Sequence, residues 1–173
     1  MSECLVCQIV DGKIPSKKIY EDDDILAILD VNGANPGHCF VMPKRHHTIF
    51  EQIPDQEVSR LFKVSNKVSS AIFESLNAHG TNIFIANGIP AGQTVAHFMI
   101  HVIPRTEGDG INLQWKPKQM EVEEISTIEV KLKDAAEHIY FEKKEPEKKT
   151  AQPVMPKLKA GKNHLMKYFE KVP

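Results

Sequence analysis

The chain has 173 residues, enough for one domain with its own hydrophobic core and an additional tail. It carries 22 Lys and Arg residues against 23 Asp and Glu residues, so its overall charge argues against a nucleic-acid or polyanion binder. No apolar run approaches the roughly 18 residues of a membrane helix, and the start lacks a signal-peptide pattern, so we expect a cytoplasmic protein with no membrane span.

The first part of the chain has the pattern of a strand meander. Residues 18–22, 24–30 and 38–43 are strand-like runs, and acidic residues, Gly and Asn separate them as hairpins require. Residues 54–78 then predict a long amphipathic helix, because apolar side chains recur there at three- and four-residue spacing. The small Ser65 fills the one gap in this apolar stripe.

Two strand-like segments surround a loop in the second half of the chain. Residues 81–87 and 95–104 are the predicted strands, and residues 87–93 form a loop rich in Gly and Pro. A second helix is predicted from about residue 121 to residue 141, where apolar residues again share one face. An antiparallel sheet that carries two helices, mostly on one side, is an α+β fold.

The strand predicted over 95–104 carries the most informative pattern. Side chains alternate between the two faces of a strand, so its apolar positions should pack in the core: Phe98, Ile100 and Val102. The opposite face carries three other side chains, successive ones about 7 Å apart: His97, Met99 and His101. A single strand histidine is more often an ordinary surface or core residue, but two of them directly after a Gly-rich loop indicate a site.

Cys4 and Cys7 have the Cys-x-x-Cys spacing of a zinc knuckle. The odd number of cysteines, three, argues against a disulfide framework in a chain without a secretory signal. A tetrahedral zinc ion needs two more ligands, for which the candidates are His46, His47 and His97. The alternative is a pair of buried or redox-active thiols.

The C-terminal part of the chain is basic, since residues 142–173 contain nine Lys and four Glu residues, a net charge of +5. Residues 142–160 predict a basic linker that contains Pro and little apolar mass. Residues 161–173 predict either a short helix or a disordered tail. This part of the chain could contact a protein partner, or it could only increase solubility.

Three stretches of the chain resemble the histidine triad (HIT) family. Residues 92–105, GQTVAHFMIHVIPR, resemble its signature, in which three histidines alternate with apolar residues after Gly-Gln-Ser/Thr-Val. Residues 4–31 resemble the family's N-terminal region, and residues 35–46 resemble the strand before its long helix. The resemblance is to the zinc-bearing branch of Hint-like and dinucleoside polyphosphate hydrolase-like proteins. It implies a HIT domain over residues 1–141, a five-stranded antiparallel sheet with two helices, and a homodimer with one continuous sheet.

The resemblance also implies which residues bind a ligand and a metal. The sheet and the Gly loop of this family bind a nucleoside phosphate, so the expected partner is a purine nucleotide or a similar heterocycle. Asp30 would hold the ribose, although it could also be an ordinary turn residue. The base would lie between four apolar residues that could also be plain core: Leu5, Val6, Ile28 and Val31. The α-phosphate would be surrounded by Asn87, Gly92, Gln93, Thr94 and His101. Structural zinc would be bound by Cys4, Cys7, His46 and His97.

Met99 stands where this family has its nucleophilic histidine. In the family this histidine attacks the α-phosphorus, and water or another acceptor then resolves the nucleotidyl-histidine. A thioether carries no proton and forms no useful adduct, so hydrolysis or nucleotidyl transfer should be impaired unless Met99 is an introduced change or His101 substitutes. Two alternatives stay open: a non-hydrolytic nucleotide sensor or binding protein, and an enzyme of different chemistry that uses His101 on a heterocyclic substrate.

Overall fold

The computed structural model describes residues 4–137 and residue 139. The chain divides into two compact units, residues 1–115 and residues 116–173, and each unit is described by itself. The predicted linker over 142–160 and the segment 161–173 lie outside the described residues. The domain boundary predicted at residue 141 stays a prediction.

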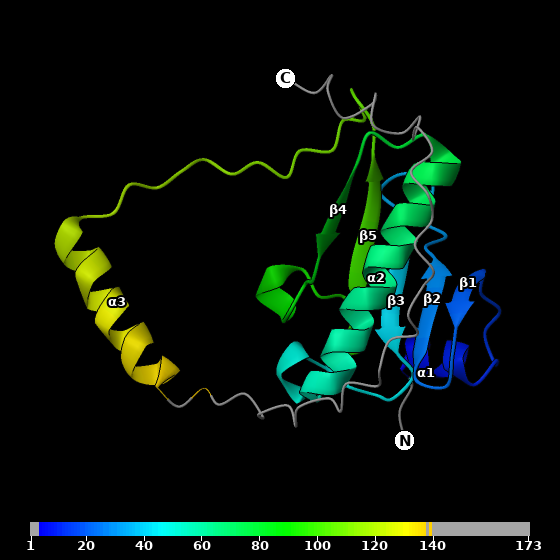
Figure 1. The fold of residues 1–173 in the computed structure, drawn as a ribbon, viewed down its shortest axis with the longest axis horizontal. Helices are drawn as coiled ribbons and strands as arrows, with labels where there is room; N and C mark the ends of the chain where they lie inside the picture. The colour runs from blue at the N-terminus through cyan, green and yellow to red at the C-terminus, as the bar shows by residue number, and fades with distance from the viewer. Residues whose placement is uncertain (1–3, 138, 140–173) are drawn as a thin grey trace, which may run out of the picture. The chain divides into compact units, whose positions relative to one another are not determined.

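A five-stranded antiparallel sheet forms the centre of the first unit, in the order β1-β2-β3-β5-β4 (Figure 1). Its strands are β1 (Lys18–Glu21), β2 (Ile25–Leu29), β3 (Cys39–Pro43), β4 (Gly80–Phe84) and β5 (Ile100–Arg105). The strands β1 and β4 are the two edges of this sheet. The predicted five-stranded antiparallel sheet is therefore confirmed.

The long helix α2 (Asp55–Leu76) covers one face of the sheet, where it packs on β3, β4 and β5 (Figure 1). Its buried stripe contains the apolar residues Leu61, Val68 and Ile72. The small Ser65 is buried in the same stripe. Ser65 donates a hydrogen bond to the Leu61 carbonyl one turn earlier, so its hydroxyl is satisfied inside the core. The helix predicted over 54–78 is thus confirmed, with Asn77 in the left-handed conformation at its end.

The opposite face of the sheet carries a smaller apolar cluster and a short helix that the sequence pattern did not reveal. Helix α1 (Leu5–Val10) buries Val6 against Leu26, Ile28 and Met42. Because its six residues complete fewer than two turns, no apolar period could be recognised for it. The sheet is therefore covered by different helices on its two faces, and the predicted number of two helices was too small.

The strand predicted over 95–104 begins later than expected, since β5 starts only at Ile100. The segment before it turns, because the His97 amide donates to the Val95 carbonyl and the Phe98 amide donates to the His47 carbonyl. The predicted division into faces nevertheless holds, because three alternate side chains are buried in the core on the α2 side: Phe98, Ile100 and Val102. Loop hydrogen bonds thus take the place of the first part of the predicted strand, while the side chains still alternate between the two faces.

The second unit contains helix α3 (Val122–Ala136), within the helix predicted over 121–141. Every residue of α3 is exposed, including the apolar residues along its one side. Among residues 4–137, no helix is both long and apolar enough to cross a membrane.

Candidate ligand pocket and metal centre

A pocket with a cavity of about 130 Å³ opens on the α1 side of the sheet. It is formed by α1, by the alternate side chains of β2 and β3 that face away from α2, and by the loop that leads into β5. Its lining residues are Leu5, Val6, Ile9, Ile28, Phe40, Met42, Ala86, Gly92, Gln93, Thr94, Val95, His97, Met99 and His101. Segments far apart in the sequence thus meet around one mostly apolar cavity.

Most of the ligand-binding residues expected from the resemblance lie around this pocket. Three of the four residues expected around the base line it: Leu5, Val6 and Ile28. Three loop residues expected around the phosphate also line it: Gly92, Gln93 and Thr94. Met99 and His101 complete this group, and with His97 all three alternate positions of this segment line one cavity.

Three expected ligand contacts do not line the pocket. The side-chain oxygen of Asn87 accepts a hydrogen bond from the Phe50 amide at 2.9 Å, and its amino group donates to Glu51 at 2.9 Å. Val31 is 85% exposed. Asp30 accepts a hydrogen bond from the Asn32 amide, as a turn residue does, while its other oxygen lies 3.4 Å from Nδ1 of His38. In the arrangement described, Asn87 is a loop anchor and Asp30 a partner of His38.

Five lining residues were not expected: Ile9, Phe40, Met42, Ala86 and Val95. The alternation of the strand over 38–43 could have indicated Phe40 and Met42, because they share the face opposite to the core residues of that strand. The sequence carries no signal for Ile9, because its position depends on α1.

The loop before β5 is held in shape by the side chain of Gln93. Its oxygen accepts a hydrogen bond from the Gly88 amide, and its amino group donates to the carbonyls of Thr48 and Val95. The backbone amides of Thr94 and Val95 make no hydrogen bond within residues 4–137. Both residues line the pocket, so these two N–H groups are available to an oxygen atom of a ligand.

His101 is the end of a short hydrogen-bonded chain. The Ala34 amide donates to Nδ1 of His38, so the neutral His38 ring carries its proton on Nε2 and donates it to Nδ1 of His101 at 3.2 Å. His101 then carries its own proton on Nε2. Burial and the neighbouring His38 lower the pKa of His101 to about 4, although Asp30 acts in the opposite direction. At neutral pH this imidazole is therefore uncharged.

Aromatic rings fix the plane of the His101 ring. Phe84 of the edge strand β4 stacks on it with ring centroids 4.5 Å apart and 9° between the planes. Phe40 meets it edge-on at 4.9 Å. The ring has little freedom to turn, so a ligand would meet His101 in one orientation.

Met99 packs at the edge of the apolar cluster on this face, against Val6, Leu26, Ile28 and Met42. It is half-buried and lines the pocket two residues before His101. The position thus presents a polarizable thioether to the pocket.

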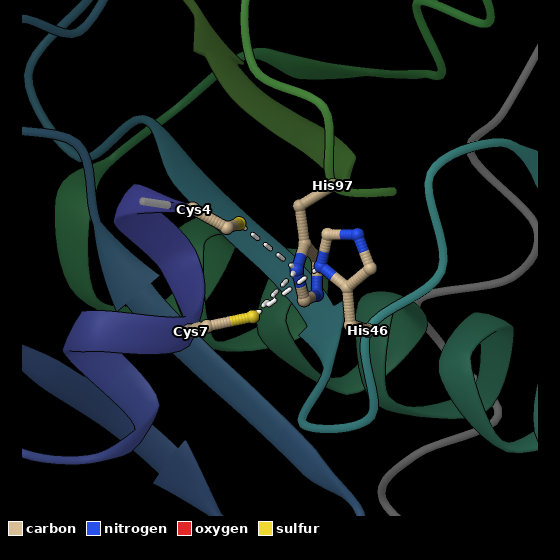
Figure 2. Close-up of side chains that lie close together, drawn as sticks. All are labelled: Cys4, Cys7, His46 and His97. Atoms are coloured by element: carbon tan, nitrogen blue, oxygen red, sulfur yellow. Dashed lines mark hydrogen bonds between the residues drawn. The ribbon is translucent and has the colours of Figure 1, made fainter. Parts of the chain in front are cut away.

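Two cysteines and two histidines lie close together, as Figure 2 shows, and one of them, His97, also lines the pocket. The Sγ atom of Cys7 lies 3.3 Å from Nδ1 of His46 and 3.8 Å from Nδ1 of His97. The Sγ atom of Cys4 lies 3.6 Å from the same nitrogen of His97. Each residue offers one ligand atom, and the four atoms lie within 4.8 Å of one another. Cys7 lies in α1 and Cys4 directly precedes this helix, while His46 lies in the loop after β3 and His97 in the loop before β5.

The geometry of this group fits a tetrahedral zinc ion. Zinc lies about 2.3 Å from sulfur and about 2.0 Å from nitrogen, which sets neighbouring ligand atoms roughly 3.3 to 3.8 Å apart. His97 is fully buried, and its Nε2 donates to the Pro43 carbonyl at 2.9 Å, which leaves Nδ1 free to bind the metal. Burial lowers the pKa of His97, so the ring stays in the neutral form that binds metals.

The Cys7 thiol favours its protonated form in the absence of a cation. Burial raises the pKa of the Cys7 thiol, and the neighbouring Cys4 raises it further. His47, the third candidate from the sequence, does not belong to the group and lies 3.6 Å from Glu57 instead. The donor set and spacing thus suit a structural zinc ion held by Cys4, Cys7, His46 and His97.

Comparison with known proteins gives the same picture of the fold. Residues 11–108 match the HIT domain family. An uncharacterized HIT-like protein of Methanocaldococcus jannaschii is 40% identical over 70% of this chain and 95% of its own. An adenosine 5′-monophosphoramidase of Candida albicans is 28% identical over 82% of this chain and 97% of its own. A zinc-bound histidine triad family protein of Mycobacterium smegmatis has a solved structure with 35% identity and a TM-score of 0.61, covering 78% of this chain and 97% of that one.

Proposed function

Since this chain belongs to the HIT domain family and is a nucleotide-binding protein of that family, we propose that its pocket binds a purine nucleotide or a similar heterocycle without the family's nucleophilic step. The observation that carries the proposal is the position of Met99, which lines the pocket two residues before His101 and presents a thioether to it. A thioether cannot form the phosphoramidate-type intermediate that an imidazole forms. Ligand binding would therefore remain while hydrolysis of phosphoanhydride or phosphoramidate bonds is lost.

The surroundings of Met99 support retained binding. The apolar walls formed by Leu5, Val6 and Ile28 suit a flat heterocyclic base, and the free amides of Thr94 and Val95 suit a ligand oxygen. Asp30, Val31 and Asn87 stay proposed ligand contacts, and each would have to turn toward the ligand on binding. The sensor role considered for the chain would use the same pocket, with residues 142–173 as the segment that contacts a protein partner.

One observation favours a second candidate function, an enzyme of different chemistry on a heterocyclic substrate. The hydrogen bonds from the Ala34 amide to His38 and from His38 to His101 orient one imidazole toward the pocket. Such an arrangement suits proton transfer by His101. This candidate would require turnover of a ligand that does not depend on a nucleophile at position 99.

The first prediction concerns the unmodified protein. Adenosine 5′-monophosphoramidate should bind to the full-length chain, as measured by titration calorimetry, and should not be hydrolysed above the rate of the buffer blank, as measured by phosphorus NMR. Binding is expected because the pocket walls are in place, and the absence of turnover because no nucleophile faces the ligand. Hydrolysis that depends on His101, tested with His101→Ala, would show that this histidine substitutes for the missing one. Absence of binding by this compound and by adenosine would refute the proposed function.

We also propose that zinc has a structural role, since four protein ligands leave no open position for water. Three unpaired cysteines, two of them in this group, suit a reducing compartment, and we propose the cytoplasm. The zinc ion would tie α1 to the loops after β3 and before β5. Two of these segments, α1 and the loop before β5, also line the ligand pocket.

A homodimer with one continuous sheet is a further proposal. Strand β4 is an edge of the sheet, and its Ile83 is 42% exposed. Phe62 and Phe73 of α2 are exposed as well, so an apolar surface is available beside this edge. Unpaired strand edges with apolar side chains are suited to pairing with another chain.

The second prediction tests this edge. Ile83→Lys should convert a dimer into a monomer in light scattering, because two lysines would face each other across the paired strands. The matched control is Ile19→Lys on β1, the opposite edge, where the isoleucine is exposed to a similar degree, 45%. This control should leave the dimer intact. A wild-type mass equal to the 19.5 kDa of one chain would contradict the proposed dimer.

A further inference from the structure

We propose that Cys4 and Cys7 form a redox switch, in which a peroxide converts their two thiolates into one disulfide, frees the zinc ion and weakens ligand binding. This inference rests on the proposed function, because it concerns the proposed zinc site and the pocket that shares residues with it. It adds a regulatory input that a purely structural metal site does not have. Three features of the molecule support it: the reach of the two sulfur atoms, the burial of the third cysteine, and the position of the metal ligands at the pocket wall.

The two sulfur atoms lie within reach of one another. The Gln8 amide donates to the Cys4 carbonyl at 3.1 Å, so one helical turn brings Cys4 next to Cys7. Their Sγ atoms lie within 4.8 Å of each other as members of the ligand group. Rotation of the side chains has to close only about 3 Å to reach the roughly 2 Å of a disulfide bond. Cys-x-x-Cys pairs of this spacing serve as reversible redox pairs in other proteins.

The pair is accessible and would be held in its reactive form. Cys4 and Cys7 are both half-buried, so a molecule as small as hydrogen peroxide can reach them from the solvent. A thiol that binds zinc has lost its proton. The thiolate is also the form that peroxides oxidise. The zinc-bound state of the protein is therefore the state in which this pair can be oxidised.

The reaction consumes one molecule of hydrogen peroxide, which takes two electrons from the cysteine sulfurs. One thiolate attacks a peroxide oxygen, the O–O bond breaks, and a sulfenic acid and a hydroxide ion form. The second thiolate attacks the sulfenic sulfur, the S–OH bond breaks, and a disulfide and a second hydroxide ion form. Protons from the solvent convert both hydroxide ions to water. A dithiol reductant reverses the step, so the disulfide would be transient in a reducing compartment.

The third cysteine of the chain does not take part. Cys39 is 1% exposed and belongs to the core cluster on the α2 side of the sheet, whereas Cys4 and Cys7 lie on the α1 side. Its thiol donates to the Gly37 carbonyl at 3.0 Å, and burial raises the pKa of this thiol to about 11. Such a thiol stays protonated and unreactive. Cys39 therefore serves as an internal reference that should remain a free thiol.

Formation of the disulfide removes both sulfur ligands and leaves only His46 and His97 for the metal. Two neutral imidazoles hold zinc far more weakly than two thiolates and two imidazoles do. Helix α1 carries Leu5, Val6 and Ile9 of the pocket wall, and His97 itself lines the pocket. Without the metal, α1 is no longer tied to the loops after β3 and before β5. The pocket wall then loosens, and the affinity for a ligand falls.

The test uses the full-length protein, prepared with zinc under reducing conditions and then treated with hydrogen peroxide. A chelating dye should record release of the zinc, and the number of free thiols should fall from three to one. The tryptic peptide of residues 1–13 contains Cys4 and Cys7 and should lose the mass of two hydrogen atoms. The Kd of adenosine 5′-monophosphoramidate, measured by titration calorimetry, should rise at least about fivefold. Dithiothreitol and added zinc should restore all four values.

The matched control is Cys39→Ala, whose fold is checked by circular dichroism. It removes a cysteine that lies outside the ligand group. This variant should release zinc as the wild-type protein does, and its free thiols should fall from two to none. A Cys39→Ala protein that binds zinc but does not release it with peroxide would assign the oxidation to Cys39 and contradict the switch.

The outcomes separate this inference from the proposed function. Reduced protein with far less than one equivalent of zinc overturns the proposed metal site and the switch together. Protein that keeps its zinc and three thiols at peroxide concentrations that oxidise free dithiothreitol overturns only the switch. Disulfide formation with an unchanged Kd contradicts the coupling to the pocket and thereby the inference. Reduced protein that binds no ligand refutes the proposed nucleotide pocket, and zinc release then decides the redox step by itself.

Discussion

Met99→His should hydrolyse adenosine 5′-monophosphoramidate roughly a thousandfold faster than the wild-type protein or more, since loss of a nucleophile typically removes most of an enzyme's rate. The new imidazole would stand on the pocket side, two residues from His101 and beside the free amides of Thr94 and Val95. The walls for the base and the donors for the phosphate are already present. The substitution therefore supplies only the missing nucleophile. Single-turnover kinetics with phosphorus NMR would measure both the rate and a nucleotidyl-histidine intermediate.

The matched control for this variant is Val95→His, which places an imidazole elsewhere on the same half-buried pocket wall. It should bind the ligand weakly or normally but should not gain hydrolysis, because the gain depends on position and not on an imidazole in general. An inactive Met99→His protein that still binds ligand would mean that position 99 is not aligned for attack. A wild-type protein as active as Met99→His would assign the chemistry to another residue.

Removal of zinc should lower the melting temperature of the protein by about 10 °C or more, and should weaken ligand binding at the same time. Helix α1 has only six residues and buries one apolar side chain, Val6, in a small cluster. Such a helix is not stable by itself, so the ligands Cys4 and Cys7 would hold it in place. The same helix carries Leu5, Val6 and Ile9 of the pocket wall. Loss of the metal should therefore open one wall of the pocket.

Two histidine substitutions make this experiment specific. His46→Ala should lose the zinc equivalent found by metal analysis and show the lowered melting temperature. His79→Ala should keep both, because His79 is also exposed but lies outside the ligand group. Purified wild-type protein with far less than one equivalent of zinc would contradict the four-ligand site. If a chelator removed zinc and the melting temperature did not change, the metal would bind at this site without stabilising the fold, and the proposed structural role would be wrong.

Much of the fold could be predicted because it depends on local patterns. The apolar stripe of α2 and the strand-like runs of the sheet repeat at the periods of helices and strands. Helix α1 was missed because it is too short for a period. The start of β5 was placed too early, because hydrogen bonds of Val95 and His47 with the His97–Phe98 backbone override the alternating pattern there.

In the site, too, some features could be predicted from sequence patterns, and others depend on how the segments pack. The four candidate zinc ligands were expected from spacing and resemblance, and the fold brings their ligand atoms together. The orientation of Asn87 could not be predicted, because a side-chain amide can form the same hydrogen bonds with a ligand or with groups of the protein. Here its side-chain oxygen accepts a hydrogen bond from the Phe50 amide and its amino group donates to Glu51. His38 and Phe84 were not singled out either, although both contact the ring of His101.

The sequence by itself determined the residue types of this site: two cysteines, paired histidines, a Gly-rich loop, and a methionine where a nucleophilic histidine is expected. These follow from composition and order, which need no coordinates. Only the tertiary structure decided how they are used. It assigned His97 to the cysteines and His101 to the pocket, and it lined that pocket with apolar side chains from α1, β2 and β3. The physical reason is that the distances between donor atoms and the burial of side chains depend on which segments pack together, and no local pattern contains that information.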